Sequence, residues 1–202
     1  MAAPTIILAS ASPRRYELLQ QLGCDPVVRP ADIDEIPKLH EAPTAFASRM
    51  AKEKAYVVAR AVIEEGNFAH PFAIVAADTV VDLDGEIFGK PIDDDDAVRM
   101  LRALSGRTHR VHTAVCVVAG TGESFHDLVT SLVTFVPITD HLLTWYIGTG
   151  EPADKAGAYA VQGAGGVLVA KVQGSMSNVV GLPLRETVSL LERAGVHRPE
   201  SR

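Results

Sequence analysis

The sequence predicts an α/β or α+β fold built around a mixed sheet, and residues 1–202 are expected to form a single domain. Short apolar runs of strand length alternate with segments of helical periodicity, which is one basis for this prediction. Turn pairs such as Asp84-Gly85 join some strands as hairpins, which adds antiparallel pairs to the sheet. The chain is long enough to bury a substantial core, and it shows neither an internal repeat nor a low-complexity linker.

The first elements expected are a short buried strand at Thr5–Ala9 and a helix directly after it. Ser12 suits the N-cap, Pro13 suits the first helical position, and the apolar face stops at Gly23. The N-terminus of a helix favours anions through its free amides and its positive dipole end. A capped surface helix with solvated arginines is the alternative to an anion site. The candidate anion-binding residues are Ser10, Ser12, Arg14 and Arg15.

An acidic loop and a long helix follow. A short strand at Pro26–Arg29 leads into a loop that contains Glu35, and acidic loops are usually solvated surface. The helix expected at Thr44–Glu65 carries an apolar stripe at helical spacing, and Lys54 falls on this stripe. Periodicity alone favours a lysine that extends along the stripe to solvent, and contact with an anion is the alternative.

The central strand is expected at Phe72–Val81, and its almost wholly apolar sequence predicts burial on both faces. Asp78 interrupts this run. A buried carboxylate is costly unless it is paired, protonated or bound to a metal, so Asp78 is a candidate for chemistry. An Asp78 carboxylate that accepts hydrogen bonds from backbone amides where the strand ends is the alternative. A hairpin returns at Glu86–Phe88, and Pro91 favours an extended Lys90 close to the strand of Asp78.

The second half of the chain is expected to continue with strands and helices. The acidic run Asp93–Asp96 precedes a helical apolar pattern, so these carboxylates are assigned to a helix start rather than to a metal site. Gln162 lies in a glycine-rich segment, where glycines permit close approach of a ligand or form turns. Further strands are expected at 111–118, 128–136 and 167–172, and helices at 139–147 and 184–194.

Composition excludes several classes of function. Only 5% of residues are aromatic and the formal net charge is −6, so neither base stacking nor a basic surface for nucleic acid is indicated. Cys24 and Cys116 lie far apart in the sequence with no Cys or His at metal spacing, so neither a disulfide framework nor a zinc site is indicated. No long apolar segment or secretory signal is visible, so we expect a cytoplasmic protein that does not contact the membrane.

The candidate residues together describe a site for a phosphate chain and a divalent cation. Mg²⁺ or Mn²⁺ takes carboxylate and phosphate oxygens, so Asp78 and Glu35 are the candidate metal ligands. Absence of a P-loop sequence argues against a P-loop kinase, and hydrolysis needs only a prepared water and stabilised leaving phosphates. The residues expected to neutralise phosphates are Arg14, Arg15, Lys54 and Lys90.

Motifs in order along nearly the whole chain resemble those of the Maf family, the septum formation inhibitor Maf-like proteins. The matching segments are 10–15, 32–35, 77–81, 89–91, 104–109, 154–159 and 178–183. This resemblance implies a long twisted mixed sheet flanked by helices, similar to the inosine triphosphate pyrophosphatase-like fold. It also implies an enzyme that hydrolyses a nucleoside triphosphate to the monophosphate and pyrophosphate. This enzyme would need a divalent metal and would form a homodimer.

The resemblance also implies roles for particular residues. The family's catalytic and phosphate-binding positions fall on Ser10, Arg14, Arg15, Glu35, Lys54, Asp78 and Lys90. Asp78 is then a general base or metal ligand, and Glu35 is its metal partner. Arg14, Thr79 and Gln162 match the branch that resembles dTTP/UTP pyrophosphatases. The Gln amide both donates and accepts, as a pyrimidine edge requires.

Other functions stay open at the level of sequence. Ala160-Val161 and Met176 depart from the family pattern near the expected base pocket. A non-catalytic regulator of septum formation, a 7-methyl-GTP pyrophosphatase and an enzyme for modified pyrimidine nucleotides are the competing hypotheses. Turnover of purified protein with Mg²⁺ or Mn²⁺ separates the regulator from the enzymes, because binding alone does not require a metal-competent carboxylate pair.

Overall fold

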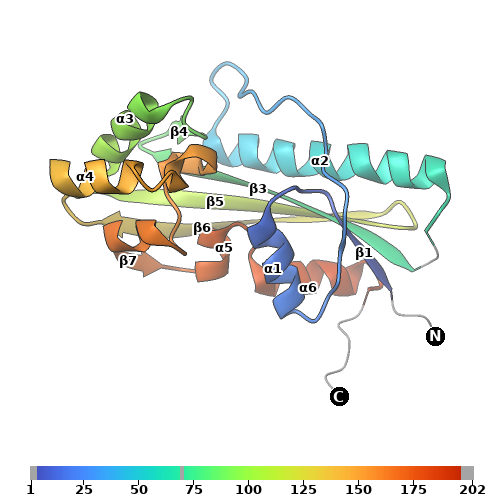
Figure 1. Ribbon diagram of the computed structural model, residues 1–202. Coiled ribbons are helices and arrows are strands. Elements are labelled where there is room, and N and C mark those ends of the chain that lie inside the picture. The colour runs from blue at the N-terminus through green and yellow to red at the C-terminus, as the bar shows by residue number, and fades with distance from the viewer. Residues whose placement is uncertain (1–3, 69–70, 197–202) are drawn as a thin grey trace.

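The computed structural model describes residues 4–68 and 71–196, which form a seven-stranded mixed sheet with helices on both faces (Figure 1). The mixed α/β fold predicted from the sequence is therefore confirmed. The strands are β1 (Thr5–Leu8), β2 (Val27–Val28), β3 (Phe72–Leu83), β4 (Glu86–Phe88), β5 (Thr108–Ala119), β6 (Ser124–Phe135) and β7 (Val169–Gln173). The α-helices are α1 (Pro13–Gln21), α2 (Pro43–Glu65), α3 (Asp94–Leu104), α4 (Asp140–Ile147), α5 (Met176–Val180) and α6 (Leu184–Arg193).

The sheet runs in the order β2-β1-β3-β5-β6-β7, with β4 paired to β3. Strand β1 pairs parallel with both β2 and β3, whereas the other pairs are antiparallel. Long apolar strands β3 and β5 lie at the centre, as their near-continuous apolar sequences require. They carry helices on both faces, so polar side chains on these strands are shielded from bulk water.

Helix α2 covers one face of the sheet, whereas α1, α5 and α6 lie on the other (Figure 1). Side chains of β3 alternate between two cores. Ile74 and Ala76 pack with α2, whereas Val75 and Ala77 pack with α1 and α6. Helices α3 and α4 enclose a third core at the far end of the sheet. By the same alternation, Asp78 belongs to the α2 face and Thr79 to the opposite face.

Strand β3 lacks a neighbouring strand along part of one edge. Strand β1 pairs with Phe72–Val75, and β4 pairs with Val81–Leu83. Within residues 4–68 and 71–196, residues 76–80 therefore have a strand partner only on the β5 side. Asp78 and Thr79 both lie in this gap. A ligand at the open edge can consequently be contacted by side chains from both faces of the sheet.

Most predicted elements are confirmed, including the helix start at the acidic run. Asp93 is the N-cap of α3, and its carboxylate accepts a hydrogen bond from the Asp96 amide at 2.8 Å. The strand predicted at 167–172 begins later, because residues 164–168 form a 3₁₀ turn. Strand β6 begins at Ser124 rather than at 128, since its polar first half pairs with β5 through the hairpin. The short helix α5 was not predicted.

Candidate functional site

A pocket of about 630 Å³ lies at the open edge of β3. This volume falls within the range of about 300–1,000 Å³ that is usual for small-molecule sites. Segments far apart in the sequence line it: the β1–α1 loop, the acidic loop, the centre of β3, the residues after β4, and the glycine-rich segment. All ten candidate residues from the sequence line this one pocket: Ser10, Ser12, Arg14, Arg15, Glu35, Lys54, Asp78, Thr79, Lys90 and Gln162.

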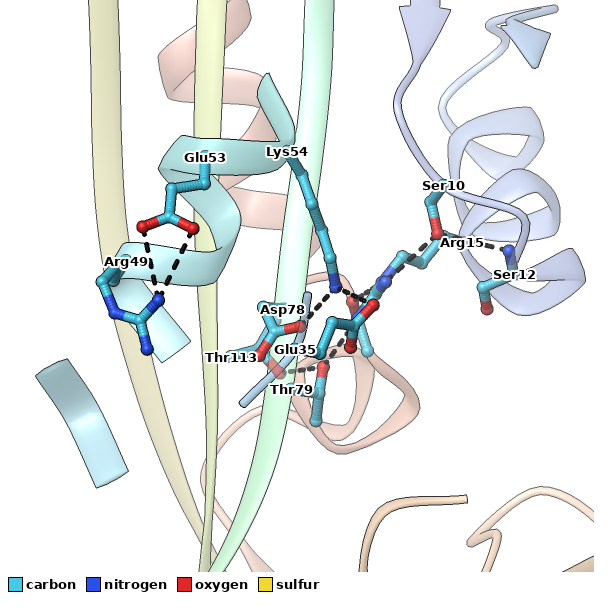
Figure 2. Close-up of polar contacts among 11 residues, drawn as sticks. Ser10, Ser12, Arg15, Glu35, Arg49, Glu53, Lys54, Asp78, Thr79 and Thr113 are labelled. Carbon is cyan, nitrogen blue, oxygen red and sulfur yellow. Dashed lines mark hydrogen bonds and ion pairs between the residues drawn. The ribbon is translucent and has the colours of Figure 1, made fainter. Parts of the chain in front are cut away.

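Lys54 lies between two carboxylates at the base of the pocket (Figure 2). Its Nζ is 2.7 Å from Asp78 Oδ1 and 2.9 Å from Glu35 Oε1. Lys54 and Asp78 are 6% and 5% exposed, whereas the Glu35 side chain is 46% exposed. The expectation that Lys54 extends along its stripe to solvent was therefore wrong. Burial of the ammonium is costly, and the ion pair with Asp78 compensates this cost. A lysine that reached solvent would not need such a partner.

The two carboxylates differ in their protonation chemistry. Burial raises the pKa of Asp78 above its ordinary value, although the charges of Lys54 and Arg15 oppose this shift. Partial burial alone would also raise the pKa of Glu35, but the hydrogen bond and charge of Lys54 outweigh it and lower this pKa. Asp78 is thus the more basic carboxylate, and Glu35 is the one held more firmly as an anion.

Arg15 is fixed against the N-terminal segment and β3. Its Nε donates to the Gly181 carbonyl at 2.9 Å, Nη1 to Ser10 Oγ at 3.1 Å, and Nη2 to Thr79 Oγ1 at 3.2 Å. Desolvation lowers the pKa of Arg15, and the charges of Asp78 and Glu35 partly offset this effect. The guanidinium therefore lies close enough to the carboxylates to interact with them electrostatically.

Ser10 and Ser12, in the β1–α1 loop, also line the pocket, and they make fewer hydrogen bonds than Arg15. Ser12 occupies the N-cap position of α1 as predicted, but its side chain makes no capping hydrogen bond. Its backbone amide instead donates to Ser10 Oγ at 3.2 Å. Ser10 Oγ accepts from both Ser12 and Arg15, so its own hydrogen is left to donate to another acceptor.

Lys90 and Gln162 are exposed residues at the pocket wall. The positive charge of Lys90 contributes to the lowered pKa of Glu35. Neither side chain is buried, so both can move toward a ligand without breaking a core contact. The loop that carries Gln162, by contrast, is firmly held.

Tyr146 and Glu151 fix this loop on both sides of Gln162. Tyr146 Oη accepts from the Ala160 amide at 3.2 Å and donates to Glu151 Oε1 at 2.8 Å. The Glu151 carboxylate also accepts from the amides of residues 164 and 165, at 2.9 and 2.8 Å. A Cβ at Gly163, whose φ is 140°, would lie 2.2 Å from Glu151 Oε2. Only glycine fits there with the carboxylate in place.

Comparison with known proteins decides the family. The model of the Maf family, described as "Maf-like protein", matches residues 5–194. The chain belongs to the Maf family. Within the described residues, this Maf chain contains no helix that is long and apolar enough to cross a membrane.

Several relatives of this Maf chain match it over nearly their whole length. A dTTP/UTP pyrophosphatase from Anaeromyxobacter dehalogenans (strain 2CP-1) is 51% identical over 203 residues, 99% of both chains. One from Myxococcus xanthus is 52% identical over 96% of this chain and 94% of that protein. One from Neisseria meningitidis serogroup B is 43% identical over 98% and 97%. A solved HAM1 protein from Coxiella burnetii aligns with a TM-score of 0.49 at 14% identity, over 94% and 99% of the two chains.

Some residues around the Maf pocket were missed by sequence reasoning. Thr113 was placed in a strand without a role, although a buried polar residue within the apolar run 111–118 is a detectable signal. Tyr146 and Glu151 gave no signal, because their contacts depend on the loop fold. Met176 was expected near the base pocket, but it is 48% exposed and does not line the pocket, whereas Ala160 and Val161 do.

Proposed function

We propose that this Maf protein hydrolyses dTTP and UTP to the monophosphate and pyrophosphate with the help of a divalent cation. One observation carries this proposal: the buried Asp78–Lys54 pair and the more exposed Glu35 lie in the same pocket as Arg14, Arg15 and Lys90. The site thus combines a basic carboxylate with cations that suit a phosphate chain. The names of relatives at 43–52% identity over nearly their whole length support the same reaction and substrates.

In the proposed reaction, Asp78 accepts a proton from the attacking water. In the metal-free site its raised pKa makes it more basic than an ordinary carboxylate. The hydrogen bond from Lys54 to Oδ1 fixes the carboxylate, and the other oxygen, Oδ2, makes no hydrogen bond within the described residues. This second oxygen is therefore available to receive the proton or, as the alternative role of Asp78, to bind the cation.

The basic residues stabilise charge on the leaving pyrophosphate. Among the described residues, Arg15 uses three of its five N–H groups in hydrogen bonds, which leaves two for a ligand, and Ser10 keeps its O–H. Arg14 and Lys90 line the same pocket. Fixed donors at the positions where charge develops stabilise a transition state without reorganisation. In this proposal the triphosphate binds between these groups and Asp78.

The carboxylates fit a hard divalent cation. Among residues 4–68 and 71–196, no group of three or more His, Cys, Asp and Glu could hold a metal alone. Asp78 and Glu35 nevertheless converge on one ammonium, and each keeps one oxygen that accepts no hydrogen bond from the part of the chain that the structure describes. Mg²⁺ commonly binds through one or two carboxylates together with substrate phosphates and water. When bound here, Mg²⁺ or Mn²⁺ would neutralise phosphate charge and make water more acidic.

Glu35 can be tested as a metal ligand with its neighbour as a control. Replacing Glu35 by Gln is expected to raise the Mg²⁺ concentration needed for half-maximal rate by at least about tenfold, because one anionic ligand is lost. Asp34→Asn removes a charge from the same exposed loop and should leave this concentration within about twofold. Rates measured across a Mg²⁺ titration decide it. An equal shift in both variants would mean that only the charge of the loop matters.

The reaction itself is tested by product analysis. Purified protein is incubated with dTTP, UTP, CTP, GTP and 7-methyl-GTP, each with Mg²⁺ or Mn²⁺, and products are separated by chromatography. We expect monophosphate plus pyrophosphate from dTTP and UTP. Cleavage of 7-methyl-GTP in their place would keep the reaction and overturn the substrate assignment. Nucleotide binding without turnover would favour a regulatory role.

The assembly and location proposed for the protein rest on family resemblance and composition. We propose a homodimer in the cytoplasm. A light-scattering mass near twice that of one chain is expected for the purified protein. A mass equal to one chain at micromolar concentration would contradict the dimer.

A further inference from the structure

Arg15 is held at the end of a chain of side-chain hydrogen bonds that leads away from the pocket (Figure 2). Its Nη2 contacts Thr79 Oγ1 at 3.2 Å, and Thr79 Oγ1 lies 2.9 Å from Thr113 Oγ1. Thr113 Oγ1 in turn lies 2.9 Å from the backbone carbonyl of Asn178. The chain thus links a pocket cation to β3, β5 and α5.

Simple donor counting fixes the direction of every hydrogen in this chain. The Asn178 carbonyl can only accept, so Thr113 uses its single hydroxyl hydrogen on it. Thr113 can then only accept from Thr79, so Thr79 uses its single hydrogen on Thr113. Arg15 must donate to Thr79, as a guanidinium has no acceptor. The order is therefore Arg15 to Thr79, Thr79 to Thr113, and Thr113 to Asn178.

The far end of the chain is rigid. Asn178 is fully buried, and its Nδ2 donates to the Val111 carbonyl at 3.0 Å and to Ser131 Oγ at 2.8 Å. Thr113 is likewise fully buried and does not line the pocket, so it cannot touch a substrate there. Its hydroxyl can influence a bound ligand only through Thr79 and Arg15.

We infer that Thr113 is a positioning residue for Arg15, and that Thr79 affects the substrate through Arg15 rather than by donating to a nucleobase. Thr79 has no hydrogen left for a carbonyl oxygen of a pyrimidine ring. The family resemblance alone implied that Thr79 takes part in substrate choice. The chain of hydrogen bonds indicates that Thr79 does so by holding Arg15. This inference rests on the proposed function for its rate measurements, but not for its binding measurements.

A double-mutant cycle tests the link between Thr113 and Arg15. Thr113→Val keeps the shape but removes the hydroxyl, and it should lower kcat/KM for dTTP about tenfold, the order expected for one positioning hydrogen bond. Thr113→Ser keeps the hydroxyl and should stay within about threefold of wild type. In an Arg15→Lys background, Thr113→Val should have less than a twofold further effect, because its route to the substrate is gone.

A purely structural role for Thr113 predicts a different pattern. Equal losses from Thr113→Val in both backgrounds, or Thr113→Ser no better than Thr113→Val, would overturn the inference. Thr187→Val provides the matched control, since it removes another fully buried threonine hydroxyl, which donates to the Pro183 carbonyl outside this chain of hydrogen bonds, and it should show no coupling to Arg15→Lys. If Thr113→Val does not fold, Thr79→Val is used in the same cycle, with the same coupling expected.

Failure of the proposed function is distinguishable from failure of this inference. If wild-type protein turns over none of the nucleotides, the proposed function fails. The same cycle is then measured as the dissociation constant of pyrophosphate by calorimetry, and the same coupling is expected. Direct recognition of the base by Thr79 is tested separately. Thr79→Val should lower kcat/KM for dTTP and UTP in equal proportion, and a tenfold rise of CTP turnover relative to dTTP turnover would overturn the route through Arg15.

Discussion

Replacing Asp78 by Asn is expected to lower kcat for dTTP by about 10²–10⁴-fold, the usual contribution of a general base. The amide keeps the size of the side chain but cannot accept the proton of a water. Lys54 still faces Glu35 at 2.9 Å, so its ammonium is not left without a partner. The variant should therefore fold, with its loss confined to turnover.

Asp82 provides the matched control for this substitution. It lies on the same strand and is 6% exposed, close to the 5% of Asp78, but it bonds His112 and the Gly85 amide and does not line the pocket. Asp82→Asn should lower the melting temperature, and kcat of the folded variant should stay close to that of the wild type. Full turnover in folded Asp78→Asn would remove Asp78 from the proposed mechanism.

Lys54→Met is expected to have the second largest effect, acting on both stability and rate. Removing one partner of a buried ion pair costs about 3–5 kcal/mol, because the other charge stays buried. Asp78 then faces only Glu35 and Arg15 among its charged neighbours, and the repulsion from Glu35 adds to its desolvation. Its pKa should rise further above the ordinary 3.8, and the positioned base should be lost.

The sign of the pH dependence follows from this shift. An acid whose pKa is raised in the folded state is favoured there when protonated, so its contribution to stability falls as pH rises through the folded pKa. The melting temperature of Lys54→Met should therefore fall further below wild type at pH 8 than at pH 5. Lys52→Met, a lysine of the same helix without an ion pair in the described structure, is the control and should show no such widening. A constant deficit at both pH values would contradict the prediction.

Pocket residues could be predicted from the sequence where a local pattern determines the structure around them. Asp78 was identified because a charge within an apolar strand needs an explanation, and the structure supplies Lys54 as its partner. Periodicity also placed Lys54 on the apolar stripe of its helix. It could not show that Asp78, 24 residues away, lies within hydrogen-bond distance, because this contact depends on how α2 packs on β3.

Contacts between distant segments account for what the sequence did not reveal. The partners of Thr113 lie 34 and 65 residues away, on β3 and α5, and no local spacing encodes them. Residues 167 and 168 were predicted as the start of a strand, but they end a 3₁₀ turn that spans residues 164–168. Hydrogen bonds from the first amides of this turn to Glu151 stabilise it. In both cases tertiary hydrogen bonds override or extend the local pattern.

Tyr146 and Glu151 hold the glycine-rich loop, yet neither lines the pocket. The path of the backbone at Gln162 is thus set independently of the side chain that it presents. If Gln162 contacts the base, as the family resemblance implies, a substitution at this one position can alter which base is recognised while the loop keeps its conformation. Substrate range can therefore diverge between descendants of a common ancestor, or be redesigned, without any change to the architecture that carries it.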